Sequence, residues 1–272
     1  MTAPTEPRQA AVAPPALHSR GLSVSRDGRP VLHQIDFSVS PGELVTIIGP
    51  NGVGKSTLLL TLLGVLRPTD GDVMFGDAPV LRLDPRSRAR MAAYVPQAID
   101  RATGLCVRDV VAGGRYAWCA PLRPPRPEDD AAVSAAIARC GLEPLVERPL
   151  DGLSAGERQK TLIAAALAQD APILMLDEPT TSLDPAVVQD ITCLLRDLHA
   201  GGHTVVIVSH DLTLPATLGG RVIALAAGRI AADGLAAEVL TPPRLREIYG
   251  VEFVEAQASD GRRLIVPAKA WT

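Results

Sequence analysis

One short segment limits the possible folds of this 272-residue chain more than any other feature. It reads GPNGVGKST, and it joins an apolar, β-branched stretch, ELVTIIG (43–49), to a helical run, TLLLTLLGVL (57–66). Glycines at such a turn let backbone N–H groups close around phosphate oxygens, which a Cβ would obstruct. The spacing is that of the G-x-x-x-x-G-K-[ST] phosphate-binding loop. We predict that a nucleotide's phosphates bind to Gly49, Pro50, Asn51, Gly52, Val53, Gly54, Lys55, Ser56 and Thr57.

Two side chains of this loop have distinct chemical tasks. Lys55 is expected to pair with the β- and γ-phosphates of the nucleotide, and Ser56 is expected to ligate Mg²⁺. The helix that follows adds the positive end of its dipole. Lys55, Lys160 and Lys269 are the only lysines among 27 basic residues. That scarcity strengthens the interpretation, because one of the three occupies the position that phosphate chemistry requires.

A second segment, ILMLDEP (173–179), supplies carboxylates. Its four apolar residues predict a buried strand, and Asp177 and Glu178 follow at the end where open α/β sheets bind ligands. Asp177 is expected to hold Mg²⁺, directly or through water, and Glu178 to polarise the attacking water as general base. Taken alone, the segment also fits a buried strand that ends in solvated acids. The phosphate loop in the same chain favours the catalytic interpretation.

The order of predicted elements indicates an α/β fold. TVVIVSH (204–210) is another apolar strand preceded by a helical segment, and RVIALAAGRIAADG (221–234) is typical of a closing hairpin. Near-continuous apolar strands that alternate with helices predict a parallel sheet covered on both faces.

Two regions depart from this alternation. LSVS (22–25) and VLHQIDFSVS (31–40) predict antiparallel strands around a turn at Asp27 and Gly28. Between about residues 98 and 160 the pattern predicts a helical insertion, with a proline-rich loop at 121–130 and a helix at 131–142.

Composition excludes several classes of protein. The net charge is −3 and only 3% of residues are aromatic, which argues against a nucleic-acid partner. The four cysteines lack the spacing of a zinc site or a disulfide framework. No uninterrupted apolar run is long enough to span a bilayer. The Pro/Ala-rich segment 1–19 has no apolar core of a signal peptide, and we expect it to be a disordered tail.

Four further motifs occur in a diagnostic order. They are YVPQ (94–97), LSAGE (153–157), SLD (182–184) and SHD (209–211). Together with the phosphate loop and the acidic strand, they make the chain resemble the nucleotide-binding subunit of an ATP-binding cassette (ABC) transporter over about residues 20–250. The resemblance implies a P-loop NTPase cassette with a RecA-like parallel-sheet core, an N-terminal antiparallel β subdomain and a helical subdomain insertion at about 98–160. Residues 251–272 would form a short C-terminal extension.

The resemblance also implies roles for individual residues. The cassette would form a head-to-tail homodimer with two ATP molecules at its interface. His210 would contact the γ-phosphate in its own subunit, Gln97 would sense Mg²⁺ and water, and Asp184 would order the interface. The signature residues Ser154, Ala155, Gly156 and Glu157 would face the nucleotide of the opposite subunit.

Two positions differ from the family pattern. Arg26 occupies the place where the family usually stacks an aromatic ring on adenine, and a guanidinium can also stack on a π-face. Ala155 replaces a common glycine of the signature, which is harmless only if its φ is negative. We therefore expect Arg26 to stack on adenine and Ala155 to be tolerated.

Two segments resemble one group within the family. CVRDVVAGGRYAW (106–118) and the C-terminal TPPRLREIYGVEFVE (241–255) are similar to the ATPases of iron–siderophore, haem and cobalamin importers. This implies an ATP-hydrolysing subunit on the cytoplasmic face of the inner membrane, bound to permease subunits and served indirectly by a periplasmic or extracellular substrate-binding protein. The alternatives are the ATPase of another ABC transporter, including an exporter, and a soluble ABC ATPase without a transport role.

Overall fold

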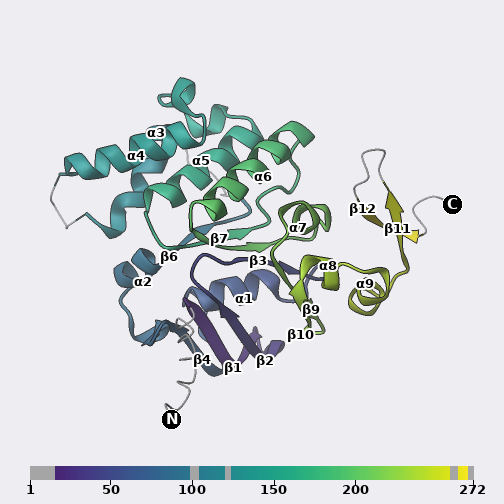
Figure 1. The fold of residues 1–272 in the computed structure, drawn as a ribbon. Coiled ribbons are helices and arrows are strands. Elements are labelled where there is room, and N and C mark those ends of the chain that lie inside the picture. Colours follow the sequence, from purple (N-terminus) through teal and green to yellow (C-terminus); the bar gives the residue numbers. More distant parts are fainter. Residues whose placement is uncertain (1–15, 99–103, 120–123, 258–262, 269–272) are drawn as a thin grey trace, which may run out of the picture.

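A six-stranded sheet in the order β10–β9–β3–β8–β7–β6 forms the centre of the protein (Figure 1). The computed structural model describes residues 16–98, 104–119, 124–257 and 263–268. The strands are β3 (Leu44–Ile48), β6 (Ala92–Val95), β7 (Ile173–Asp177), β8 (Thr204–Val208), β9 (Arg221–Ala226) and β10 (Arg229–Leu235). All neighbours pair in parallel except β9 and β10, which form the predicted hairpin. The predicted parallel sheet is therefore confirmed.

Both faces of this sheet are buried. Val205 and Ile207 of β8 pack into one apolar cluster, and Val206 and Val208 pack into another. Successive side chains of a strand point to opposite faces, so a strand covered on both sides needs a continuous apolar run. This explains the apolar composition of β3, β7 and β8.

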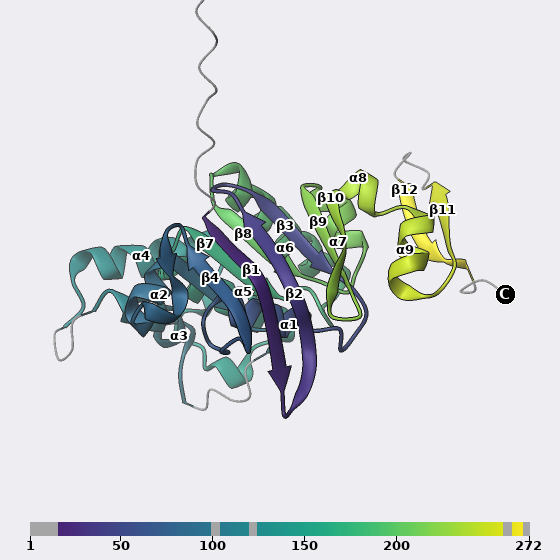
Figure 2. The ribbon, with the colours of Figure 1, turned by 90° about the horizontal axis from the view of Figure 1, so that it is seen from below.

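A smaller antiparallel sheet, β2–β1–β4–β5, covers one face together with α1 (Lys55–Leu62). Its strands are β1 (Leu17–Arg26), β2 (Arg29–Val39), β4 (Asp70–Phe75) and β5 (Ala78–Pro79). Figure 2 shows β1 and β2 running side by side to their shared turn. The predicted hairpin is confirmed, but β1 starts earlier than expected.

The predicted tail 1–19 overlaps the start of that strand. Leu17 is fully buried and pairs with Val39, so residues 17–19 belong to β1. Gly21, at φ +56, and a register shift between Ser19 and Leu22 interrupt the alternating pattern, which hid the first half of the strand from sequence analysis. Residues 1–15 of the predicted tail lie outside the described part.

The helical block contains α3 (Val107–Gly113), α4 (Pro127–Arg139) and α5 (Ala155–Ala168). Short 3-10 helices cover Gly114–Ala117, Glu143–Leu145 and Leu150–Gly152. The helix expected at 131–142 is present, but it begins at Pro127, inside the segment predicted to be a loop. Proline suits the first turn of a helix, and the Asp129 carboxylate accepts a hydrogen bond from the Arg126 backbone N–H there. Helix α5 also continues past the expected boundary at 160.

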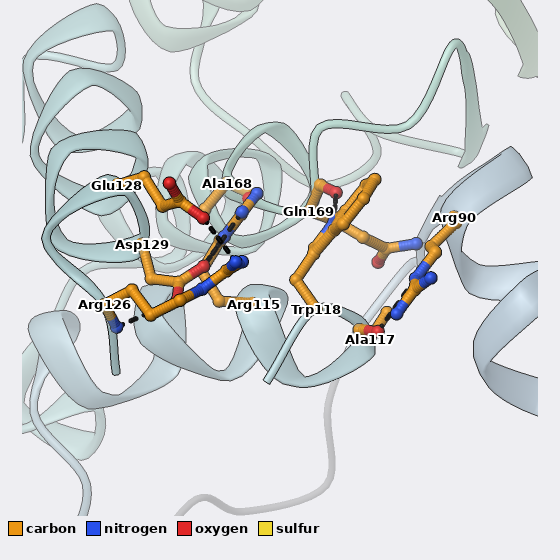
Figure 3. Close-up of polar contacts among 9 residues, drawn as sticks. All are labelled: Arg90, Arg115, Ala117, Trp118, Arg126, Glu128, Asp129, Ala168 and Gln169. Atoms are coloured by element: carbon orange, nitrogen blue, oxygen red, sulfur yellow. Dashed lines mark hydrogen bonds and ion pairs between the residues drawn. The ribbon is translucent and has the colours of Figure 1, made fainter. Parts of the chain in front are cut away.

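A polar cluster joins this helical block to α2 (Pro85–Met91) and β6 (Figure 3). Trp118 lies between Arg90 and Arg115, whose guanidinium carbons are 4.8 and 5.3 Å from its ring centroids. Its indole N–H donates to the carbonyl of Gln169, whose side-chain amide donates to backbone carbonyls of α2 and β6. Arg115 is buried and paired with Asp129 at 2.9 Å. The cluster therefore fixes the end of the helical block against the strand that leads to Gln97.

The remaining elements follow the sheet toward the C-terminus. They are the 3-10 helix Val80–Arg82, α6 (Pro185–Ala200), α7 (Thr213–Leu218), α8 (Ala236–Val239), α9 (Pro242–Tyr249), β11 (Phe253–Gln257) and β12 (Arg263–Pro267). The β11–β12 hairpin and α9 lie beside β9 and β10 at one end of the molecule (Figure 2). Among the described helices, none is both long and apolar enough to cross a bilayer.

Candidate active site

The phosphate loop connects the C-terminal end of β3 to α1, as predicted. Gly49, Gly52 and Gly54 have φ values of 148°, 78° and 109°, a region that L-residues rarely adopt. A Cβ on Gly49 would lie 2.4 Å from the Leu225 carbonyl oxygen, and one on Gly54 would lie 2.7 Å from the Leu32 side chain. Backbone conformation therefore favours glycine at all three positions, and space also requires it at Gly49 and Gly54.

Lys55 lies folded back on this loop. Its ammonium donates to the carbonyls of Gly49 at 2.8 Å and Pro50 at 3.1 Å, and its side chain is buried. Burial lowers the pKa of Lys55, while Glu178 and Asp177 act in the opposite direction. No side chain caps the start of α1, so its first N–H groups are left for an anion. A phosphate group would satisfy both these donors and the ammonium.

Asp177 ends β7 directly beside the start of α1. Its Oδ1 accepts from the Ser56 hydroxyl at 3.0 Å, and its Oδ2 accepts from the Tyr94 hydroxyl at 3.4 Å. Burial raises the pKa of Asp177, and the nearby Glu178 adds to that effect. Burial likewise raises the pKa of Tyr94 to about 12. The carboxylate is therefore in surroundings that favour pairing with a positive charge.

Ser56 and Asp177 fit a magnesium site. Mg²⁺ prefers hard oxygen ligands and usually binds through one or two carboxylates and substrate phosphates. The observed pair places one hydroxyl and one carboxylate together at the phosphate loop. A bound Mg²⁺ would neutralise phosphate charge there.

Glu178 is the residue on which the other catalytic candidates converge. Its Oε2 accepts from the Gln97 amide at 3.2 Å and from the Thr181 hydroxyl at 3.0 Å, and it lies 2.9 Å from His210 Nδ1. The backbone of Glu178 has φ +50, a left-handed conformation that costs about 1–3 kcal/mol in a non-glycine residue. Its amide donates to the Val208 carbonyl at 2.9 Å, which holds this turn in place. The carboxylate is thus oriented by groups from three separate loops.

The signature residues lie at the start of α5. Ser154 and Glu157 form a reciprocal capping box: the Ser154 N–H donates to the Glu157 carboxylate at 2.8 Å, and the Glu157 N–H donates to the Ser154 hydroxyl at 3.3 Å. Ala155 is the first helical residue and has no positive φ, so the condition set for this replacement is met. A Cβ on Gly156 would lie 2.7 Å from the Val187 side chain of α6. The two helix N-termini therefore pack closely.

Asp184 directly precedes α6, and Arg26 ends β1. The Asp184 carboxylate caps α6 through the N–H groups of Ala186 and Val187, both at 3.1 Å. Arg26 is exposed at the end of β1, beside the hairpin turn. These contacts are local, and the interface and adenine roles of the two residues stay predictions.

The structure gathers most of the predicted residues. Lys55, Ser56, Asp177, Glu178, Gln97 and His210 meet at the ends of β3, β6, β7 and β8, whereas the signature residues are engaged with α5 and α6. Sequence analysis missed Tyr94 and Thr181. Thr181 stands three residues after Glu178, where a hydroxyl can return to the carboxylate, but Tyr94 meets Asp177 only through the pairing of β6 with β7.

This combination of fold and site defines a P-loop nucleoside triphosphatase: a strand, a glycine loop and a helix present lysine and serine beside an acidic strand. Residues 32–181 match the ABC transporter family model. The chain belongs to the ABC transporter family and is one of its ATPases.

The relatives agree with this assignment. The hemin import ATP-binding protein HmuV of Nocardia farcinica is 39% identical over 274 residues, covering 98% of this chain and 93% of that protein. The iron(3+)-hydroxamate import ATP-binding protein FhuC of Bacillus subtilis is 34% identical, covering 87% and 88%. A solved metal-chelate type ABC transporter in an inward-facing conformation has a TM-score of 0.83 at 27% identity, covering 94% of this chain and 98% of that one.

Proposed function

We propose that this chain is the motor subunit of an importer for haem or another iron chelate, with Mg²⁺-dependent ATP hydrolysis at the site described above. The catalytic part of this proposal rests on one observation: Gln97, Thr181 and His210 hold the Glu178 carboxylate beside the Ser56–Asp177 pair. We further propose the division into a cassette at about 20–250, a helical subdomain at about 98–160 and a C-terminal extension at 251–272.

The residues divide the work between binding and proton handling. Lys55 leaves the Gly49 and Pro50 carbonyls and pairs with the β- and γ-phosphates, while the loop N–H groups hold the remaining oxygens. Glu178 accepts the proton of the attacking water as general base. A proton on Nδ1 of His210 would be donated to the Glu178 carboxylate, and in the imidazolium form, where Nε2 also carries a proton, that second nitrogen would donate to the γ-phosphate.

The signature motif supports a dimeric motor. Ser154 and Glu157 cap helix α5, and Gly156 lies in its first turn, so the N-terminus of that helix offers a hydroxyl, backbone N–H groups and a dipole to an anion. In a head-to-tail pair these groups complete the ATP site of the second subunit. The solved cassette MJ0796, with a TM-score of 0.72 and 26% identity, is a dimer bound to ADP and Pi.

An exposed face around α2 suits a membrane partner. Val65, Leu81 and Tyr116 are large apolar side chains exposed by 66%, 47% and 71%. Arg86 of α2 stacks on Tyr116, with its guanidinium carbon 5.2 Å from the ring centroid. Apolar side chains with an arginine beside them are typical of protein interfaces. We propose that permease subunits bind here and keep the chain on the cytoplasmic face of the inner membrane.

The names of the curated relatives indicate the cargo of the proposed importer. Curated proteins similar to this chain are named for hemin, iron(3+)-hydroxamate and achromobactin transport. Import of haem or a ferric siderophore, delivered by a periplasmic or extracellular binding protein, is therefore the first choice, and cobalamin is the next substrate to test.

Co-purification tests this assignment. The chain would be purified with its membrane partner, and ATPase activity would be measured with loaded binding proteins for haem, ferric siderophores and cobalamin. We expect haem or a ferric chelate to stimulate hydrolysis. Stimulation only by an unrelated cargo, or co-purification with an export permease, would contradict the importer assignment, and a chain without a membrane partner would favour the soluble alternative.

A further inference from the structure

Gln169, at the C-terminal end of α5, holds the start of strand β6. Its side-chain amide donates to the backbone carbonyl of Ala92, the first residue of β6, at 3.0 Å, and to that of Ala89 in α2. A glutamine amide carries two N–H donors, so it can serve both carbonyls. Since α2 ends at Met91 and β6 begins at Ala92, this one amide group fixes the junction of the two elements.

Strand β6 needs such support because it lies at the edge of the central sheet. In the described part of the chain it pairs with β7 alone, from Ala92 with Ile173 to Val95 with Leu176. An edge strand lacks the second ladder of hydrogen bonds that holds an inner strand in place. The position of this short strand therefore depends on contacts outside the sheet.

The strand leads directly to a catalytic candidate. β6 ends at Val95, and Pro96 is the one residue between the strand and Gln97. Because proline fixes its own φ and restricts the residue before it, the direction of the strand is passed on to Gln97 with little freedom. The Gln97 amide donates to Glu178 Oε2 at 3.2 Å. A displacement of about 1 Å at such a contact can lower a catalytic rate about 10²-fold.

The backbone of Gln169 is tied to the helical block (Figure 3). Its carbonyl accepts from the Trp118 indole N–H at 2.6 Å, and the carbonyl of Ala168 accepts from the Arg115 guanidinium at 3.0 Å. The last carbonyls of an α-helix have no partner within the helix, so these two contacts cap the end of α5. Gln169 thus joins α5, whose N-terminus carries the signature motif, to β6.

We propose that Gln169 is a positioning residue for ATP hydrolysis: its side-chain amide fixes the start of β6, so that the strand presents Gln97 to Glu178. This inference rests on the proposed hydrolysis of ATP at this site. The phosphate loop joins β3 to α1, and none of the described hydrogen bonds of Gln169 reaches it. Gln169 therefore acts on the rate of hydrolysis and not on the affinity for ATP.

Single-turnover hydrolysis by Gln169→Met separates positioning from simple support. Methionine is also unbranched but has no N–H donor, so the variant loses both hydrogen bonds of the side chain. With enzyme in excess over Mg²⁺-ATP, we expect the rate constant of hydrolysis to fall about tenfold, while the steady-state KM for ATP stays within about twofold. Gln189→Met, at an exposed position of α6, is the matched control and should keep the wild-type rate constant.

The rate constant is the deciding readout. An unfolded fraction lowers the amplitude of a single turnover but leaves its rate constant unchanged. A Gln169→Met protein with a lower Tm and the wild-type rate constant would assign Gln169 a structural role only and overturn the proposal. Absence of ATP hydrolysis by the wild type would instead contradict the proposed function.

A double-mutant cycle tests whether Gln169 acts through Gln97. When Gln97→Ala has already removed the contact with Glu178, adding Gln169→Met should lower the rate constant by less than about twofold further, because residues that act through one contact are not additive. The same loss from Gln169→Met in both backgrounds would show independent effects and overturn the proposal.

Discussion

At the scale of single residues, sequence analysis can identify those catalytic candidates whose residue type is required by the chemistry of a single motif. A phosphate loop needs glycine, lysine and serine at set positions, so the sequence alone predicts Lys55 and Ser56. The contact of Thr181 with Glu178 is local, three residues along the chain, whereas the contact of Tyr94 with Asp177 depends on the pairing of β6 with β7, and no local pattern predicts it. The motif identifies the reacting groups, whereas the fold decides which neighbours orient them.

Arg26 is the residue whose proposed role differs most from the family pattern. If its guanidinium stacks on adenine, Arg26→Ala should weaken ATP binding about two- to fivefold, since an exposed stack of this kind contributes roughly 0.5–1 kcal/mol. Calorimetric titration with ATP and with GTP measures the effect. Unchanged affinity for both nucleotides would show that Arg26 makes no contact with the base.

Gly156 gives a stability prediction at the same scale. Alanine would ordinarily favour a helix, but here its Cβ would lie 2.7 Å from Val187. We expect Gly156→Ala to lower the free energy of unfolding by about 1–2 kcal/mol, as overpacking does. Urea denaturation without nucleotide measures this loss. Gly152→Ala is the control, because its Cβ would meet nothing within 4 Å; equal stability of the two variants would refute the packing argument.

At the scale of elements, predictability follows the regularity of the pattern. Strands β3, β7 and β8 are short apolar runs between turns or motifs, and all three were predictable from sequence. The start of β1 was not, because Gly21 and a register shift break its alternation. The start of α4 was missed because a proline-rich stretch suggests a loop until Asp129 is seen to cap it.

The buried pair at the base of α4 predicts a dependence of stability on pH. The Arg126 backbone N–H, and then the Arg115 side chain, lower the pKa of Asp129. A lowered pKa means that the stabilisation is fully present above the ordinary carboxyl pKa of about 3.9 and is lost as pH falls through the folded value. Asp129→Asn should therefore reduce Tm at pH 7, with a gap that narrows toward pH 3.

Thermal melts from pH 7 to pH 3 measure that gap. Asp130→Asn, at the exposed neighbouring position, should follow the wild type throughout. A gap between wild type and Asp129→Asn that stays constant with pH would show that the carboxylate charge contributes nothing to the junction.

At the scale of the whole molecule, the chain offers the two halves of an ATP site on different elements. The phosphate loop and acidic strand lie at the ends of the central strands, while the signature motif caps α5. Sequence motifs alone predict that both halves exist, and the fold shows that the signature residues are engaged with α5 and α6. Pairing two copies head to tail would bring the phosphate loop of one copy next to the signature motif of the other.

Replacement of the proposed base tests this account most directly. Glu178→Gln keeps the shape of the side chain but cannot accept the proton of water, so ATP hydrolysis should fall by about 10²–10⁴-fold while ATP binding persists. With ATP and Mg²⁺, light scattering coupled to gel filtration should then show a stable dimer that retains two ATP molecules. Full ATPase activity in the variant, or an ATP-loaded monomer, would contradict the account.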